Sequence, residues 1–205
     1  MKHPSLFIAI VAASILLVGC DSFAVLEQFR KGPLSLTVEK DSVQQAETIG
    51  LSPAGGVPPY SYVLVEGALY SAGTLGSVSG NTYTAGSAIG TVFIQLTDTD
   101  GTSVDAVVTI IPPTPASFNA QPNSATPLAN DILLSWSYAD TSLISGFQIQ
   151  RSSDGVTFTV LATEPSTSTN YVDSPVNPNQ TYYYRMYAVA GAYQSLPTAV
   201  LGSTP

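Results

Sequence analysis

The chain has 205 residues, a formal net charge of −8 at pH 7 and charged side chains at only 10% of its positions. This acidic balance excludes nucleic acid from the expected partners, because proteins that bind nucleic acid gather positive charge to replace counterions. It also argues against a basic patch for anionic lipid. The 11 Tyr, together with many Thr and Val, favour half-buried strands, and the 16 Gly and 15 Pro supply turns. The composition therefore favours an all-β protein.

The first twenty residues have the layout of a secretory signal. Lys2 precedes an uncharged run, residues 6–18, that is too short to cross a bilayer comfortably as a helix. Residues 17–20, Leu-Val-Gly-Cys, resemble the lipobox of bacterial lipoproteins. The resemblance implies that a signal peptide, residues 1–19, is removed and that the Cys20 thiol carries a diacylglycerol. The alternative is a plain signal peptide or a short anchor helix with a coincidental cysteine.

Lipidation of Cys20 has direct chemical consequences. The only His, His3, lies in the removed segment, and the only thiol is consumed by lipid. Catalytic dyads and triads that need His, Cys nucleophiles and His/Cys zinc sites are then excluded, so we expect neither a cofactor nor enzymatic activity. Two or three acyl chains suffice for durable anchoring. The sequence thus predicts a membrane partner, reached through the N-terminal lipid, and a location outside the cytoplasm.

The residues after the cysteine leave the membrane undetermined. Asp21 follows Cys20, and in the enterobacterial lipoproteins that this segment resembles, such an aspartate implies retention at the inner membrane. Other bacterial groups do not follow that rule, so the inner membrane and the outer membrane or cell surface both stay open. Residues 20–32 are interpreted as a lipidated tether. Alternatively, the apolar residues between Phe23 and Phe29 form a small patch on the membrane or on the first domain.

A Pro-rich segment divides the rest of the chain. Three of the four residues 112–115 are Pro, which cannot continue a sheet ladder and prefers an extended backbone. We therefore predict a first domain at residues 33–111, a linker at 112–115 and a second domain at 116–205. Because so short a Pro-rich linker is semi-rigid, the two domains should lie end to end.

Short alternating segments predict an antiparallel β-sandwich for the first domain. The expected strands include residues 34–38, 48–51, 60–65, 92–96 and 104–111. The strings GGVPPYSYVLVEG and GTVFIQLTDTDG resemble bacterial Ig-like repeats of surface and secreted proteins. The resemblance implies an Ig-like sandwich.

Two carboxylates in this domain suggest a cation site. Asp98 and Asp100 lie one residue apart and could share a Ca²⁺ ion, although such a site usually needs six or more oxygens and the further acidic positions of the full calcium-loop motif are missing. Asp and Gly also dominate hairpin turns for conformational reasons. We therefore expect a turn at residues 98–101, with calcium as the weaker alternative.

The second domain also reads as a sandwich. Residues 132–136, 146–151 and 182–188 alternate as strands, and Tyr182, Tyr184, Met186 and Ala188 are expected to form an inward face. The strings LLSWS, GFQIQRSSDGVTFTVLA and NYVDSPVNPNQTYYYRMYAV resemble a fibronectin type III domain.

The fibronectin type III resemblance implies structural roles for particular residues. Trp136 matches the core tryptophan of the family, and Tyr182 matches its tyrosine corner, where the hydroxyl bonds back to the backbone. Pro197 falls on the expected last strand, at an edge that tolerates a missing N–H. The family's integrin-binding tripeptide, Arg-Gly-Asp, is absent from the sequence, so the resemblance implies a fold without a ligand.

The outward side of the 182–188 strand is the candidate binding surface. Tyr183 and Tyr187 flank Arg185, with Tyr193 as a further candidate member of the strip. Aromatic faces beside a guanidinium can stack on sugar rings or receive a partner protein. Outward tyrosines also decorate β-faces simply because aromatic cross-strand packing is favourable.

Three classes of function follow from these features. The leading interpretation is a non-enzymatic, membrane-anchored extracytoplasmic lipoprotein that acts as a protein-interaction or adhesion module. The alternative is a carbohydrate-binding accessory lipoprotein of the cell envelope, so an unknown protein or an envelope glycan is the expected partner. A carboxylate-only enzyme such as a glycosidase is disfavoured, because the acidic residues are scattered and no third domain supplies a cleft.

Overall fold

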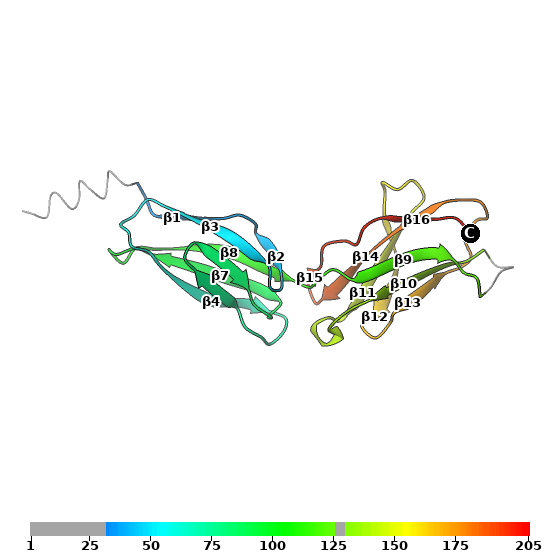
Figure 1. Cartoon of the computed structure of the whole chain (residues 1–205), viewed down its shortest axis with the longest axis horizontal. Helices are drawn as coiled ribbons and strands as arrows, with labels where there is room; N and C mark the ends of the chain where they lie inside the picture. Colours follow the sequence, from blue (N-terminus) through cyan, green and yellow to red (C-terminus); the bar gives the residue numbers. More distant parts are fainter. Residues whose placement is uncertain (1–31, 126–129) are drawn as a thin grey trace, which may run out of the picture.

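The computed structural model describes residues 32–125 and 130–205, which fold as two β-sandwiches placed end to end (Figure 1). Strands β1 to β8 build the first sandwich and strands β9 to β16 the second, and the pairing within these residues keeps the two sets of sheets separate. The chain enters at the far end of the first sandwich and ends at the opposite tip of the second (Figure 1). The described residues contain no helix with the length and hydropathy needed to cross a bilayer.

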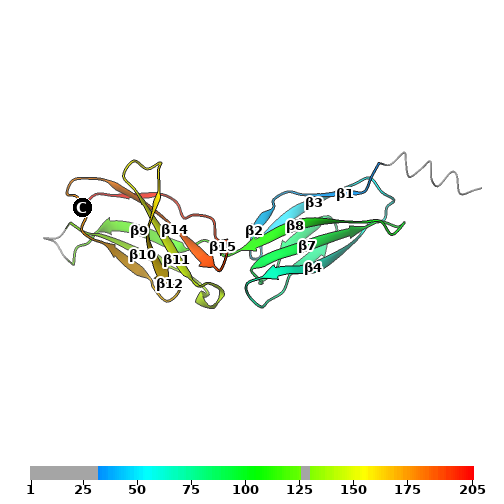
Figure 2. The same ribbon diagram turned by 180° about the vertical axis from the view of Figure 1, so that it is seen from behind.

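Two four-stranded sheets face each other in the first sandwich. One has the order β1-β3-β6-β5 and the other β2-β8-β7-β4, with β2 parallel to β8 and the other pairs antiparallel (Figure 2). The strands are β1 (Ser35–Val38), β2 (Ser42–Gln44), β3 (Thr48–Ala54), β4 (Ser61–Leu69), β5 (Gly76–Ser79), β6 (Thr82–Ala85), β7 (Gly90–Thr97) and β8 (Ser103–Ile111).

Alternation along the strands builds the first core. Val92, Ile94 and Leu96 on β7 are fully buried, as the period-two pattern predicts. Each such side chain contributes about 1.5–3 kcal/mol by leaving water. On β4, Tyr62 packs against the core, whereas Val63 is 54% exposed on the outer face.

The second sandwich pairs a three-stranded sheet with a larger one. The smaller sheet has the order β13-β10-β9, and the larger has the order β12-β11-β14-β15, with β16 also paired to β14. The strands of this second sandwich are β9 (Ala116–Pro122), β10 (Ile132–Ser137), β11 (Gly146–Ser152), β12 (Thr159–Pro165), β13 (Asn170–Asp173), β14 (Tyr182–Ala190), β15 (Tyr193–Gln194) and β16 (Leu201–Ser203). A short 3-10 helix, η1 (Thr141–Leu143), precedes β11. The two sandwiches differ in one strand, because β5 joins the sheet of β1, β3 and β6, whereas β12 stays beside β11.

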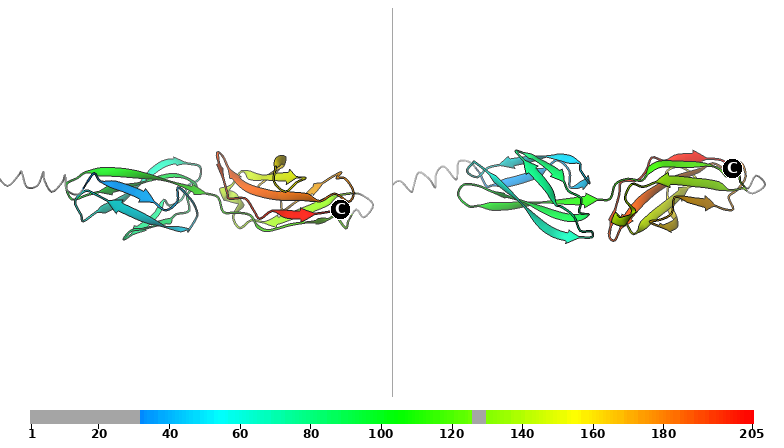
Figure 3. Two further views of the ribbon diagram at one scale, coloured as in Figure 1. Left: turned by 90° about the horizontal axis from the view of Figure 1, so that it is seen from above. Right: turned by 60° about the horizontal axis from the view of Figure 1, so that its bottom comes forward.

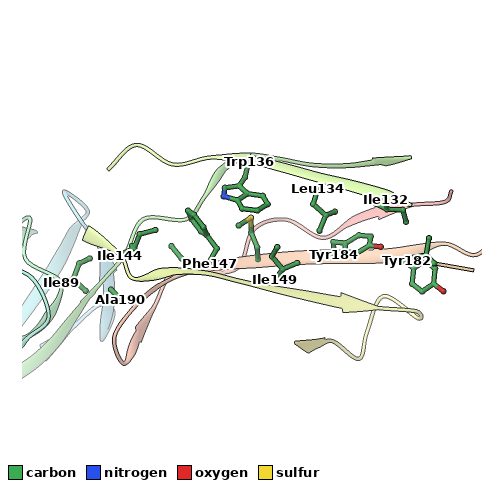
Figure 4. Packing of buried hydrophobic residues seen from close by; sticks show 13 residues of the cluster. Ile89, Ile132, Leu134, Trp136, Ile144, Phe147, Ile149, Tyr182, Tyr184 and Ala190 are labelled. Carbon is green, nitrogen blue, oxygen red and sulfur yellow. The ribbon is translucent and has the colours of Figure 1, made fainter. Parts of the chain in front are cut away.

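Aliphatic and aromatic side chains together build the second core (Figure 4). Trp136 is 5% exposed, and its ring meets that of Phe147 edge-on at a centroid distance of 5.4 Å. The inward face expected on β14 is confirmed, since Tyr182, Tyr184, Met186 and Ala188 are all buried.

The segment after β15 departs from the predicted last strand. Pro197 lies between β15 and β16 rather than within a strand. On either side of it, Ser195 and Thr198 donate backbone N–H groups to the carbonyls of Ala188 and Met186. Their hydroxyls accept the N–H groups of the same two β14 residues at 2.9 and 3.1 Å. Pro lacks a backbone N–H and its ring fixes φ, so a regular strand is not continued at this position. The hydroxyls of Ser195 and Thr198 therefore accept the β14 N–H groups that strand carbonyls would otherwise accept.

Direct contacts join the two sandwiches, whose ends meet across residues 112–115 (Figure 3). Ile89, at the end of the first sandwich, is fully buried in the hydrophobic cluster of the second, beside Ile144 and Ala190 (Figure 4). The Tyr193 hydroxyl donates to the Ala68 carbonyl at 2.9 Å. A buried apolar side chain and a hydrogen bond that cross the joint restrict hinge motion between the sandwiches.

Candidate interaction face of the second sandwich

The outward side of β14 is the surface that the sequence singles out. Tyr183, Arg185 and Tyr187 are each partly exposed and alternate with the buried residues of the same strand. The register places Gln150 of β11 opposite Arg185 and Gln148 opposite Tyr187. The structure therefore brings the three predicted residues onto one sheet face, which we call the Arg185 face: Gln148, Gln150, Phe158, Tyr183, Arg185 and Tyr187.

Two aromatic rings and an amide hold Arg185 in place. The centre of its guanidinium lies 4.3 Å from the ring centroid of Phe158 and 5.6 Å from that of Tyr187. Its Nε donates to Gln150 Oε1 at 2.8 Å, and Gln150 Nε2 donates in turn to Gln148 Oε1 at 3.1 Å. Each cation–π contact at a partly exposed site contributes about 0.5–1 kcal/mol. The guanidinium is thus pre-oriented, with donors left over for a ligand.

The hairpin between β11 and β12 brings Phe158 to this face. The Asp154 carboxylate accepts the N–H groups of Val156 and Thr157, both at 2.8 Å, and the Ser152 hydroxyl at 2.6 Å. These hydrogen bonds stabilise the charged carboxylate and hold the pKa of Asp154 well below its usual range. The bond from Ser152 has the largest effect. Gly155 adopts a φ of +75° in this turn, a conformation that favours glycine.

Tyr183 lies over two glycines at the rim of the face. A Cβ at Gly155 would lie 3.5 Å from its ring, and one at Gly202 would lie 3.3 Å from it. The absence of side chains at these two positions leaves room for the ring to lie flat. Tyr183 is therefore partly a packing residue.

Charge distinguishes Arg185 from the other cations in residues 32–125 and 130–205. Lys40 pairs with Glu47 at 2.5 Å, and Arg151 pairs with Asp173 at 2.9 Å. Arg185 is the third cation in this part of the chain and has no carboxylate within salt-bridge distance among the described residues. An unpaired guanidinium on an acidic protein is a natural point of contact for a carboxylate supplied by a partner.

The residues expected to be structural are buried. Trp136 packs in the core, and the Tyr182 hydroxyl accepts the backbone N–H of Asn177 at 3.3 Å and donates to Gln180 Oε1 at 3.2 Å. The guanidinium of Arg151 lies 5.0 Å from the Tyr182 ring centroid. The hydrogen bond between the Tyr182 hydroxyl and the backbone of Asn177 is of the kind that the tyrosine-corner resemblance implies.

The geometry around Asp98 accounts for its carboxylate without a cation. Asp98 is 6% exposed, its Oδ2 accepts the Val57 N–H at 3.0 Å, and its Oδ1 accepts the Thr102 N–H at 2.9 Å. The Gly101 N–H closes the turn on the Asp98 carbonyl at 3.1 Å. Among the described residues, no group of three or more His, Cys, Asp or Glu side chains is placed to hold a metal ion. Asp100 lies in the same turn, and the hydrogen bonds of Asp98 are those of the expected turn.

Two further predictions fall elsewhere. Tyr193 is not part of the Arg185 face, because its hydroxyl is engaged at the joint, where it donates to Ala68 and lies 3.4 Å from Thr91 Oγ1. Cys20 and Asp21 lie outside the described residues. The sequence pattern did not single out Phe158 and Gln150, which the structure places on the Arg185 face. The available signal was the alternation of Val156, Phe158 and Val160 after a tight turn, which directs Phe158 to the same side as the outward residues of β11.

Comparisons with known proteins bear on the fold. No protein-family model matches the chain, and no curated protein matches it. Among solved structures, a segment of two fibronectin type III domains from chicken tenascin is 16% identical, covers 82% of this chain and 98% of its own, and superposes with a TM-score of 0.51. A Fn3-like protein from Clostridium thermocellum is 29% identical over 44% of this chain and 90% of its own, with a TM-score of 0.38.

The strand order and the similarity to the tenascin segment define the fold. The chain is an all-β protein of tandem sandwiches with a fibronectin-type-III-like fold.

Proposed function

We propose that this protein is a membrane-anchored, extracytoplasmic lipoprotein whose second sandwich binds a partner protein through the Arg185 face. The environment of Arg185 is the main support for this proposal. Its guanidinium contacts the rings of Phe158 and Tyr187 and lacks a carboxylate partner among the described residues. Tyr and Arg are the residues most enriched at the energetic centres of protein interfaces. The expected contact on the partner is an Asp or Glu side chain beside an apolar residue.

The position of the face supports a role as a presented surface. The described chain enters the first sandwich at the end farthest from the second (Figure 1). If Cys20 carries lipid, the first sandwich acts as a spacer, and the contacts of Ile89 and Tyr193 keep the spacer and the binding sandwich in line. An N-terminal anchor and a binding surface on the distal sandwich fit an adhesion or interaction module.

The strand order of the first sandwich favours the Ig-like assignment. Its sheets β1-β3-β6-β5 and β8-β7-β4 have the ABED and GFC arrangement of immunoglobulin domains, with β2 added beside β8. The second sandwich has its fourth strand beside β11 instead, as in fibronectin type III domains. Ig-like and fibronectin type III modules in series are suited to spacing and recognition, which agrees with a non-enzymatic role.

Site-specific photo-crosslinking tests the proposal. A benzoylphenylalanine at position 187, in intact cells, is expected to form a discrete adduct with one partner protein. Arg185→Glu, which reverses the charge beside the probe, is expected to abolish that adduct. The matched control carries the same probe at Val107, which is 49% exposed on the outer face of the first sandwich. The same adduct from both positions, or an adduct unaffected by Arg185→Glu, would contradict the proposal.

A further inference from the structure

A groove lies along one side of the first sandwich, where the edges of its two sheets meet. Strand β4 ends one sheet and β5 ends the other, and a cavity of about 390 Å³ opens between them. It is lined by Tyr60, Tyr62, Leu64, Val78, Gly80 and Asn81. Its volume lies within the range of about 300–1,000 Å³ that small-molecule sites occupy. The groove is on the other sandwich from the Arg185 face and plays no part in the function proposed above.

The two tyrosines present their hydroxyl oxygens as acceptors. Tyr60 donates its hydroxyl proton to the Gly55 carbonyl at 2.6 Å, and Tyr62 donates to Asn81 Oδ1 at 3.1 Å. Each phenol thereby uses its single donor and keeps lone pairs for a ligand. Burial, and then the neighbouring Tyr60, raise the pKa of Tyr62, so this hydroxyl stays neutral at physiological pH.

Asn81 supplies the complementary donors. Its side-chain oxygen accepts from Tyr62, and its backbone carbonyl accepts the Leu51 N–H at 2.8 Å, which fixes the residue at the turn between β5 and β6. Gly80 opens this two-residue turn with a φ of +57°. The Asn81 amide nitrogen has no acceptor among the described residues. It therefore leaves two N–H donors beside the Tyr62 hydroxyl.

The lining selects for an uncharged ligand. None of the six lining residues carries a charge, although the chain as a whole is acidic. Leu64 and Val78 contribute apolar surface, and the tyrosine rings offer faces on which C–H groups can stack. Donors, acceptors and apolar faces in one narrow groove match a sugar ring, whose hydroxyls both donate and accept and whose axial C–H groups form an apolar face.

We propose that the groove between β4 and β5 binds a neutral glycan, with Tyr60 and Tyr62 contacting the sugar ring and Asn81 donating to a ring hydroxyl. This gives the first sandwich a ligand of its own. A protein that is held at an envelope could thus contact a polysaccharide with its first sandwich and a protein with its second.

Saturation-transfer difference NMR tests the glycan site on the full chain in a zwitterionic detergent without a sugar headgroup. The probes are cellotetraose, laminaritetraose and maltotetraose, with tetragalacturonic acid as a charged probe of equal length. At least one neutral probe is expected to give saturable transfer, and the charged one none. Asn81→Ala should weaken binding about five- to tenfold, the loss expected for one hydrogen bond. Tyr60→Ala should weaken it by about tenfold or more.

Controls separate this site from the Arg185 face. Asn81→Asp keeps the acceptor for Tyr62 but removes the amide donors, so it should lose the glycan while the melting curve is retained. Tyr187→Phe and Arg185→Glu should leave glycan binding unchanged, and Asn81→Ala should leave the crosslink at position 187 unchanged. Absence of transfer from all three neutral probes, equal transfer from tetragalacturonic acid, or unweakened binding by both Asn81 variants would overturn the proposal.

Discussion

Removal of the Asp173 carboxylate should strongly destabilise the second sandwich. Asp173 is 3% exposed and accepts Arg151 Nη1 at 2.9 Å on both oxygens and the Tyr184 hydroxyl at 2.7 Å on Oδ2. Asp173→Ala leaves a cation and a buried hydroxyl without their acceptor. The three residues come from β13, β11 and β14, so the cluster links both sheets.

The size of the effect follows from the exposure of each partner. Removing one partner of a buried ion pair costs about 3–5 kcal/mol, and the Arg151 side chain is 33% exposed, so solvent lowers its share toward the bottom of that range. The Tyr184 hydroxyl, whose residue is fully buried, adds about 1 kcal/mol. We expect a loss of about 4 kcal/mol for Asp173→Ala, compared with about 1 kcal/mol for Tyr184→Phe, which leaves the ion pair intact.

Urea unfolding followed by tryptophan fluorescence measures this loss. The chain has a single Trp, Trp136, whose side chain packs in the second core, so the signal reports on the sandwich that carries Asp173. The urea midpoint of Asp173→Ala should fall by about 1–4 M, given the usual slopes for small domains. A free energy of unfolding within 1 kcal/mol of wild type would refute the reasoning, because it would mean that desolvation of the pair cancels its attraction.

Three further predictions concern the first sandwich and the joint. Ile89→Ala should cost about 2–5 kcal/mol at the joint and split a shared calorimetric transition into two; a single transition at the wild-type temperature would argue against coupling. Asp98→Ala should lower the free energy of unfolding by about 3 kcal/mol through two lost bonds to a charged acceptor, and added Ca²⁺ should leave the wild-type melting temperature unchanged. Burial raises the pKa of Tyr83 to about 12, so its contribution is complete below pH 10 and is lost as the pH rises toward 12. Urea midpoints between pH 9 and 12 should fall less steeply for Tyr83→Phe, and an equal slope would exclude this origin.

Local alternation was enough to predict much of the fold. Whether Tyr184 or Tyr183 faces the core depends only on period-two geometry along one strand, and the same holds for Val92 and Ile94. The sequence therefore identified the outward residues of β14 before any tertiary contact was known. Its assignment of a turn at residues 98–101 also rested on local chemistry, which the backbone bonds to Asp98 satisfy.

Contacts between distant segments could not be predicted in this way. Phe158 reaches Arg185 only because the β11–β12 hairpin closes with a particular register and a bulge near Gln150. The sequence suggested Tyr193 as a surface residue. Its hydroxyl instead donates to the Ala68 carbonyl, which lies 125 positions earlier in the chain. The groove at Tyr62 likewise depends on how two sheet edges come together, which no single strand encodes.

Lipid attachment at Cys20 is the claim on which the proposed placement depends most. Cells expressing the tagged protein would be labelled with an alkyne fatty acid, fractionated, and compared with a Cys20→Ala strain. We expect label and membrane association for the wild type and the loss of both in Cys20→Ala. A wild-type protein that carries no label, or a Cys20→Ala protein that remains in the membrane fraction after a high-salt wash, would contradict it.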